Sequence, residues 1–158
     1  YALEMMADTT GDRNWYNMIR EGSTVTMEAW GYRYKPNLDW HHAWGAVPAN
    51  IIPRQIWGIP PKTPGYGVAT IRPAMSKLKQ STIKVPTLRG PITGKYKWVH
   101  SRKQVYTIEV PANMVGEFSL KLQENQALSL NGQKVNLAFG AVQLFPGKNV
   151  LEVNLIPF

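Results

Sequence analysis

The sequence predicts a mixed fold, with helices in its first part and an antiparallel β-sandwich after them. Five of the six tryptophans lie before residue 60. Three prolines and a glycine then fall within residues 59–66, and proline fixes φ and removes a backbone donor, so no helix or central strand passes through this seam. After the seam, short segments alternate apolar and polar residues, as half-buried strands do. We therefore expect two domains, residues 1–61 and 62–158.

The first part predicts three helices. Residues 1–9 place apolar side chains at helical spacing. A second helix over residues 13–20 can be capped by Asp12 and ended by Gly22. A third helix begins near Pro48 and runs toward Trp57. So few helices cannot bury this many aromatic rings against one another, and we expect them to pack on partners outside this chain.

The second part predicts about seven strands and no helix. Turn signals separate the strands, and the Asn131-Gly132 dipeptide is the strongest short hairpin signal among them. Short strands at regular spacing are typical of an antiparallel sandwich. The predicted strands are residues 67–72, 81–85, 94–98, 105–110, 117–122, 127–130 and 150–156.

Composition excludes several classes of protein. The chain has no cysteine, which rules out a disulfide scaffold and a cysteine zinc site. No apolar run approaches the roughly 20 residues that a membrane-spanning helix needs. The net charge of +8 comes from residues 62–158, which hold 13 lysines and arginines against four acids. These cations are dispersed along the predicted strands, which favours a solvated basic surface over a nucleic-acid site.

Residues 23–45 are rich in tryptophan, tyrosine, histidine and carboxylates, a composition typical of carbohydrate sites. Aromatic faces stack on the C–H faces of a sugar, while its hydroxyls need paired donors and acceptors. A glycosidase also needs two carboxyl groups that flank the scissile bond, and Glu28 and Asp39 are the candidates in this segment. A loop between helices that is packed by aromatic rings explains the same composition.

The order of short motifs resembles one enzyme family. Thr26-x-Glu28-x-Trp30, followed by the string His41-His42-Ala43-Trp44-Gly45-Ala46, is similar to the end of the catalytic barrel in bacterial α-L-rhamnosidases of glycoside hydrolase family 78. The resemblance covers roughly residues 1–125. Further motifs that carry it are Pro64-Gly65-Tyr66, Ile71-Arg72-Pro73, Gly90-Pro91-Ile92 before Trp98, and Val110-Pro111.

The resemblance implies an (α/α)6 barrel followed by a β-sandwich, and removal of terminal α-L-rhamnose with inversion at the anomeric carbon. Glu28 matches the general base, His41 matches a histidine that contacts the sugar, and Trp30 would line the same pocket. Two departures are that Met27 stands where a tryptophan commonly precedes the glutamate, and that the loop from Trp30 to His41 is short. Residues 1–61 would then be the last helices of the barrel.

The family's general acid lies early in the barrel, upstream of anything in this chain. The chain opens at Tyr1 with no initiator methionine, and we expect it to be a piece of a longer, secreted or periplasmic bacterial protein. By itself it should be inactive, because it needs the upstream barrel segment. The expected partner is a rhamnose-containing glycoside or polysaccharide. No cofactor, metal or nucleic acid is expected.

Other interpretations remain open. The sandwich could be the working part of a non-catalytic carbohydrate-binding or structural module, or its charge could bind nucleic acid or another anionic polymer. Glu28 could be a capping or ion-paired glutamate, and His41 a core histidine bonded to backbone. A metal site at His41 and His42 is disfavoured because adjacent side chains diverge and no third ligand has zinc spacing. Convergence of Glu28, Trp30 and His41 on one concave surface would favour the enzyme.

Overall fold

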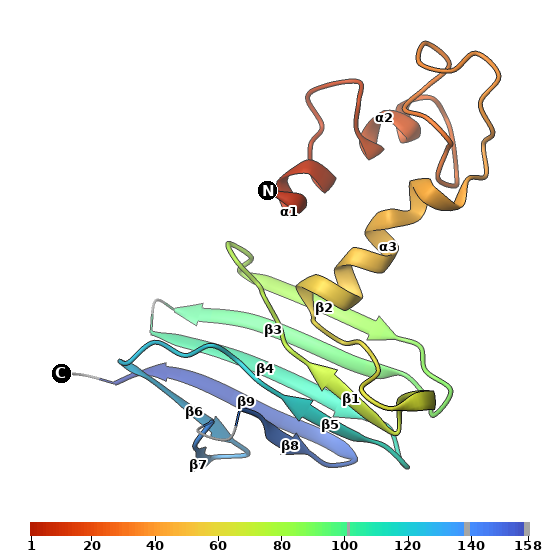
Figure 1. Ribbon diagram of the computed structural model, residues 1–158. Helices are drawn as coiled ribbons and strands as arrows, with labels where there is room; N and C mark the ends of the chain where they lie inside the picture. The colour runs from red at the N-terminus through yellow and green to blue at the C-terminus, as the bar shows by residue number, and fades with distance from the viewer. Residues whose placement is uncertain (101, 138–139, 157–158) are drawn as a thin grey trace. The chain divides into compact units, whose positions relative to one another are not determined.

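The computed structural model describes residues 1–100, 102–137 and 140–156, and the chain forms two compact units, Tyr1–Ile52 and Pro53–Phe158 (Figure 1). The limits predicted from the sequence for the two domains stay a prediction. None of the helices in the described residues has the length and apolar character that a membrane crossing requires.

The first unit consists of short helices joined by long loops. Its elements are α1 (Ala2–Met6), α2 (Trp15–Arg20), the 3-10 helix η1 (Ala43–Ala46) and α3 (Val47–Ile51). The cap of α2 differs from the prediction: the Asn14 side chain accepts a hydrogen bond from the Asn17 N–H at 2.8 Å, so the helix begins two residues later than expected. Asp12 instead bonds to side chains of a later loop.

A small apolar core holds these loops together. Met18, Met27 and Leu38 are buried, and partly buried side chains pack around them, Trp15 and Trp30 among them. The two indoles meet edge to face, with ring centroids 5.0 Å apart. Large apolar side chains of the same unit remain exposed, including Trp44 at 63%. Within the described residues this unit therefore leaves aromatic surface unburied, as the sequence predicted.

The helix predicted from Pro48 to Trp57 is shorter and changes type. After α3 the chain continues as the π-helix η2 (Ile52–Ile56), which contains Pro53. Proline cannot donate in the helical hydrogen-bond ladder, and π-type turns accommodate such interruptions. Trp57 follows η2 and is fully buried in the core of the second unit. The expectation that the aromatic rings of the first part pack on partners outside this chain therefore does not hold for Trp57.

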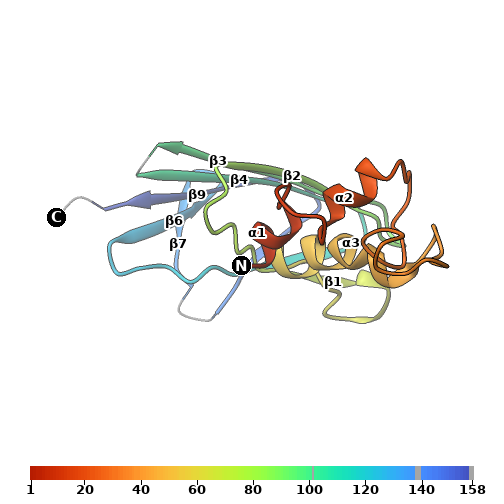
Figure 2. The same cartoon turned by 90° about the horizontal axis from the view of Figure 1, so that it is seen from above.

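The second unit is built from two β-sheets, together with the 3-10 helix η3 (Pro64–Tyr66). The first sheet has the strand order β1-β5-β8 and the second has the order β2-β3-β4-β9-β6-β7. Figure 2 shows β1 on the opposite side of the unit from β2, β3 and β4. The strands are β1 (Val68–Ile71), β2 (Gln80–Val85), β3 (Ile92–His100), β4 (Lys103–Val110), β5 (Val115–Phe118), β6 (Gln126–Leu130), β7 (Gln133–Val135), β8 (Val142–Leu144) and β9 (Gly147–Leu155).

Strand pairing agrees with the predicted sandwich except in one place. β1 pairs with β5 in parallel, with Ile71 opposite Phe118, so the sheets are not antiparallel throughout. Every other described pairing between strands is antiparallel. The predicted hairpin at Asn131-Gly132 joins β6 to β7, and both residues have positive φ, as a type I′ turn requires. The short strands β7 and β8 had not been predicted.

Both sheets contribute to one core. Ile71 and Phe118 come from the three-stranded sheet, while Tyr106 and Ile108 come from the six-stranded sheet, and all four are buried in the same cluster. Tyr106 packs edge to face on Phe118, with ring centroids 5.6 Å apart. Burial raises the pKa of Tyr106 far above its usual range. The unit is therefore sandwich-like.

Trp57 fixes the proline-rich seam against this core. Its side chain is 0% exposed, and its indole N–H donates to the Ser81 hydroxyl at 3.0 Å. Gly94 on β3 leaves room for the ring, since a Cβ there would lie 2.4 Å from an indole carbon. The absence of a side chain at Gly94 is thus a packing requirement of Trp57.

Gly94→Ala tests this packing. The added methyl group would overlap the indole, and overpacking of this kind costs roughly 1–3 kcal/mol. We expect the free energy of unfolding of the sheet unit to fall by about this amount, measured by urea denaturation followed by circular dichroism.

Trp57→Phe supplies the control background. The smaller ring leaves space for the new methyl group, so Gly94→Ala should cost less stability in the Trp57→Phe protein than in the parent. Equal costs in the two backgrounds would show that Trp57 does not set the requirement for glycine.

Candidate functional site

The candidate site lies in the first unit, where two loop segments run beside each other. The Glu28 N–H donates to the Asp39 carbonyl at 2.9 Å, and the His42 N–H donates to the Thr26 carbonyl at 2.9 Å. These backbone bonds bring Glu28 next to residues 39–42. The loop path, rather than a regular helix or strand, therefore positions the glutamate.

The Glu28 side chain is 11% exposed, and its carboxylate has two hydrogen-bond donors and one imidazole beside it. Oε1 accepts a hydrogen bond from the Lys35 ammonium, and Oε2 accepts one from the Asp39 N–H at 3.1 Å. The His42 Nε2 atom lies 3.9 Å from Oε1. Glu28 is therefore ion-paired, as one of the alternatives from the sequence proposed, and it is also one of the residues that line a cavity.

The same contacts lower the pKa of Glu28. The Lys35 hydrogen bond is the largest cause and the Asp39 N–H the next, and together they outweigh partial desolvation, which acts in the opposite direction. Hydrogen bonds and a nearby cation both favour the charged form of a carboxyl group. Glu28 is therefore a carboxylate at neutral pH, the protonation state that a general base requires.

His42 and Trp44 form a stacked pair beside the carboxylate. Their ring centroids lie 4.2 Å apart with an interplanar angle of 25°. The Trp44 indole N–H donates to the Glu28 carbonyl at 3.3 Å. The His42 Nδ1 atom is buried and has no hydrogen-bond partner among the described residues. The imidazole is thus held by stacking, with one nitrogen facing the carboxylate.

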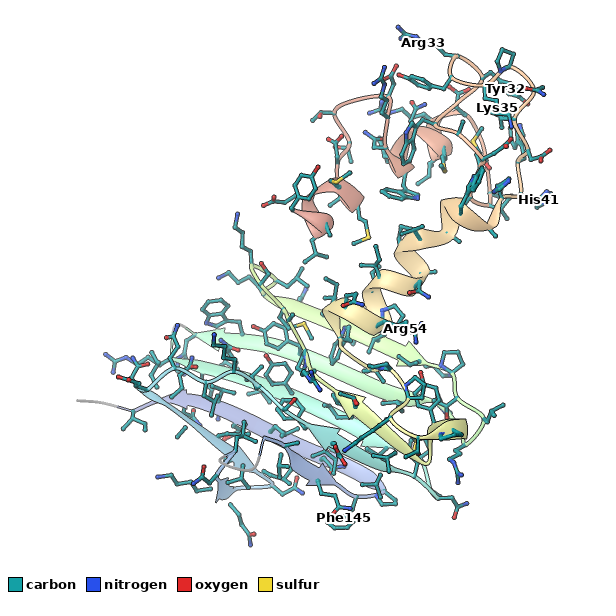
Figure 3. All side chains as sticks on the ribbon, in the orientation of Figure 1. Tyr32, Arg33, Lys35, His41, Arg54 and Phe145 are labelled. Atoms are coloured by element: carbon teal, nitrogen blue, oxygen red, sulfur yellow. The ribbon has the colours of Figure 1, made fainter. Side chains whose placement is uncertain are left out.

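Lys35 belongs to a loop that polar contacts hold in place. The Tyr34 hydroxyl donates to Asp12 Oδ1 at 2.6 Å, and the Arg33 guanidinium bonds to Asp12 Oδ2 at 3.1 Å. The Tyr34 hydrogen bond is also the largest cause of the lowered pKa of Asp12. Figure 3 shows Tyr32, Arg33 and Lys35 gathered at this loop. Asp12 therefore holds the loop that carries Lys35, and Lys35 in turn keeps Glu28 charged.

A cavity of about 380 Å³ opens beside Glu28. This volume falls within the range of about 300–1,000 Å³ that is usual for small-ligand pockets. Its lining residues include three tryptophans and one glutamate, residue types that suit a ligand with apolar faces and hydroxyl groups. The lining residues are Trp15, Met18, Met27, Glu28, Ala29, Trp30, Trp44, Gly45 and Val47.

The structure brings together some of the residues singled out from the sequence. Glu28 and Trp30 line the same cavity. His41 is exposed and lies at the outer side of the loop (Figure 3), outside the residues that line the cavity. The Asp39 backbone contacts Glu28, while its side chain is exposed.

The sequence did not predict that Lys35, His42 and Trp44 lie against Glu28. The contact with Lys35 spans seven positions of irregular loop, and no periodicity predicts such a contact. The doubled histidine His41-His42 is visible in the sequence, but the sequence alone does not show that His42 lies beside Glu28. Only the loop path decides which of two adjacent imidazoles faces the carboxylate.

The fold of the chain is shared with solved α-L-rhamnosidases. The enzyme from Dictyoglumus thermophilum matches with a TM-score of 0.75 and 19% identity, over 97% of this chain and 18% of that one. The Streptomyces avermitilis enzyme complexed with L-rhamnose matches with a TM-score of 0.73 and 22% identity, over 97% of this chain and 16% of that one. The Aspergillus terreus enzyme matches with a TM-score of 0.71 and 19% identity, over 96% and 17%.

A family-model match adds to this likeness in fold. Residues 58–134 match the family described as bacterial alpha-L-rhamnosidase C-terminal domain. The resemblance noted in the sequence is thereby confirmed. The chain spans less than a fifth of the length of the three solved enzymes. No curated protein sequence matches it significantly.

Lys35→Met tests the electrostatics of the site. Losing the ammonium removes the main cause of the lowered pKa, so the Glu28 pKa should rise toward its ordinary value, as measured by carboxyl ¹³C NMR titration. A carboxyl whose pKa is lower in the folded state stabilises the fold above its unfolded pKa, and this stabilisation is lost as pH falls through the folded pKa. The variant should therefore have a lower free energy of unfolding than the parent at neutral pH, and this difference should be smaller in acid.

Lys62→Met is the matched control for this titration. It removes a similar lysine–glutamate pair, with Glu117, from the sheet unit. The Glu28 titration should not move in this variant. An unchanged Glu28 midpoint in Lys35→Met would contradict the assignment.

Proposed function

We propose that the chain is the C-terminal part of an inverting α-L-rhamnosidase, with residues 1–61 forming the last helices of its (α/α)6 barrel. The observation that carries this proposal is an ionised glutamate, Glu28, among the lining residues of a cavity that three tryptophans also line. The family match over residues 58–134 and the likeness in fold over 97% of the chain support the same enzyme class.

Glu28 acts in this proposal as the general base. Its carboxylate accepts a proton from a water molecule while the water oxygen attacks the anomeric carbon, on the face opposite the leaving group. The bond from that carbon to the aglycone oxygen breaks, and a general acid elsewhere in the longer protein protonates the departing oxygen. The two carboxyl groups of an inverting enzyme stand roughly 6.5–9.5 Å apart, which leaves room for the water.

Neighbouring groups prepare Glu28 for this step. Lys35 and the Asp39 N–H keep the carboxylate charged before the reaction, and the His42 imidazole lies near Oε1. Because these groups also compete with water for the carboxylate oxygens, they set how basic Glu28 is. We propose that they position and tune the base without contacting the sugar.

The sugar contacts come from aromatic and imidazole side chains. Trp30 lines the cavity and offers an apolar face to the pyranose ring. His41 is exposed, and an exposed imidazole can hydrogen-bond to a sugar hydroxyl. The partner would be a rhamnose-containing glycoside or polysaccharide met outside the cytoplasm, in a secreted or periplasmic protein.

Glu28→Gln tests the role of the base in a protein that holds this chain together with its barrel. The amide keeps the shape of the side chain but cannot accept the proton. General-base catalysis contributes roughly 10²–10⁴-fold, so kcat on an aryl α-L-rhamnoside should fall by about that factor. ¹H NMR of the parent reaction should show β-L-rhamnose as the first product.

Chemical rescue separates loss of the base from loss of folding. In a Glu28→Gly variant, azide can enter the vacated space and attack the anomeric carbon without a base. Formation of β-L-rhamnosyl azide would support the assignment. Normal turnover by Glu28→Gln would overturn it.

The 158-residue chain alone should not hydrolyse aryl α-L-rhamnosides, because an inverting mechanism needs a second carboxyl group as acid. The measurement is release of nitrophenol by the purified chain over a long incubation. Turnover that is lost on Glu28→Gln would contradict the proposal, since it would show that both catalytic carboxyls lie in this chain.

A further inference from the structure

A second cavity, of about 290 Å³, lies entirely within the sheet unit. It forms where η2 and the residues after it lie along the end of β1. Its wall is mostly polar and carries two arginines and a glutamine. The lining residues are Arg54, Gln55, Gly58, Pro60, Thr70 and Arg72.

Main-chain bonds fix the shape of this cavity. The Arg72 N–H donates to the Gly58 carbonyl at 3.0 Å, and the Thr70 N–H donates to the Pro60 carbonyl at 3.1 Å. Gly58 has a φ of +62°, and a Cβ there would lie 2.2 Å from the Arg72 carbonyl oxygen. The close approach of the backbone at Gly58 to the backbone at Arg72 therefore depends on glycine.

The backbone between η2 and β1 also brings Arg54 and Arg72 to one wall of the cavity. The Ile59 N–H donates to the Pro53 carbonyl at 2.9 Å, which closes the chain between η2 and the seam. Arg54 on η2 and Arg72 after β1 consequently line one cavity although they are distant in sequence. Figure 3 shows Arg54 at the end of the helix beside the sheet.

The charge at this cavity is not balanced. Arg54 and Arg72 are both exposed, and neither guanidinium has an ion pair among the residues that the structure describes. The unit has four acids, and two of them are paired elsewhere: Glu117 pairs with Lys62, and Glu152 pairs with Lys103. Two unpaired guanidiniums in a concave polar wall favour an anionic ligand.

We propose that this cavity binds an oxyanion, a carboxylate or a sulfate ester, carried on a glycan chain. A guanidinium presents paired donors that match the oxygens of either group, and the Gln55 amide adds a neutral donor. The glycan part of the proposal rests on the proposed function, because that function supplies a polysaccharide as the partner. The sheet unit then selects acidic glycans.

The test measures binding by the 158-residue chain, without any turnover. Four probes are titrated at physiological ionic strength: a galacturonic acid trisaccharide, sulfated maltotriose, maltotriose and inorganic sulfate. NMR follows the arginine Nε–H groups and the Gly58 amide. At least one acidic trisaccharide should shift the Arg54, Arg72 and Gly58 signals, and maltotriose should not. Which acidic probe binds decides between carboxylate and sulfate ester.

Variants of the cavity make the assignment specific. Arg54→Gln and Arg72→Gln should each weaken binding of the acidic trisaccharide by about tenfold, the loss expected for one charge-assisted hydrogen bond. Both side chains are exposed, so neither change should affect folding, and thermal unfolding checks this. Arg102→Gln is the matched control, because it removes an exposed arginine of the same unit that does not line the cavity.

Three results would overturn the proposal. Equal weakening by Arg102→Gln would show general attraction to the charge of the unit. Inorganic sulfate binding as tightly as the trisaccharides would show a free-ion site. If neither acidic trisaccharide shifts the Arg54, Arg72 and Gly58 signals, the cavity does not bind an oxyanion on a glycan. None of these results bears on Glu28, so failure here is distinguishable from failure of the proposed function.

Discussion

The burial of the Trp57 indole over Gly94 is the constraint on which the architecture of the sheet unit depends. The ring fills the space that a side chain on β3 would occupy, and its N–H is satisfied by Ser81. A buried indole of this size fixes the residues on either side of it. The seam after η2 is therefore part of the sandwich rather than a free linker, and the wall that carries Arg54 and Arg72 is formed as a consequence.

The candidate site in the first unit is organised differently. Few apolar residues are buried there, and the position of Glu28 depends on polar contacts between loops. Asp12 holds the loop that presents Lys35, and Lys35 holds the carboxylate charged. The charge of Glu28 thus depends on a series of connected hydrogen bonds, and the loss of one changes the next.

Much of the fold could be predicted from the sequence, because alternation and turn chemistry are local signals. The strands around residues 94–98 and 105–110 and the hairpin at Asn131-Gly132 are found as predicted. The parallel pairing of β1 with β5 was not predictable, since a four-residue strand carries no mark of its partner. At the site, residue types pointed to Glu28 and Trp30, but the contacts of Lys35 and His42 depend on the path of an irregular loop.

Gly45 limits how this site can be altered. A Cβ at this position would lie 2.5 Å from the Met27 carbonyl oxygen, so any side chain would push apart the two segments that hold the glutamate. The positions before it are free of this restriction, since His41 and Trp44 are exposed. Redesign of the sugar preference that we propose should therefore vary these two side chains and keep the glycine, because the backbone spacing must survive before any new specificity can be expressed.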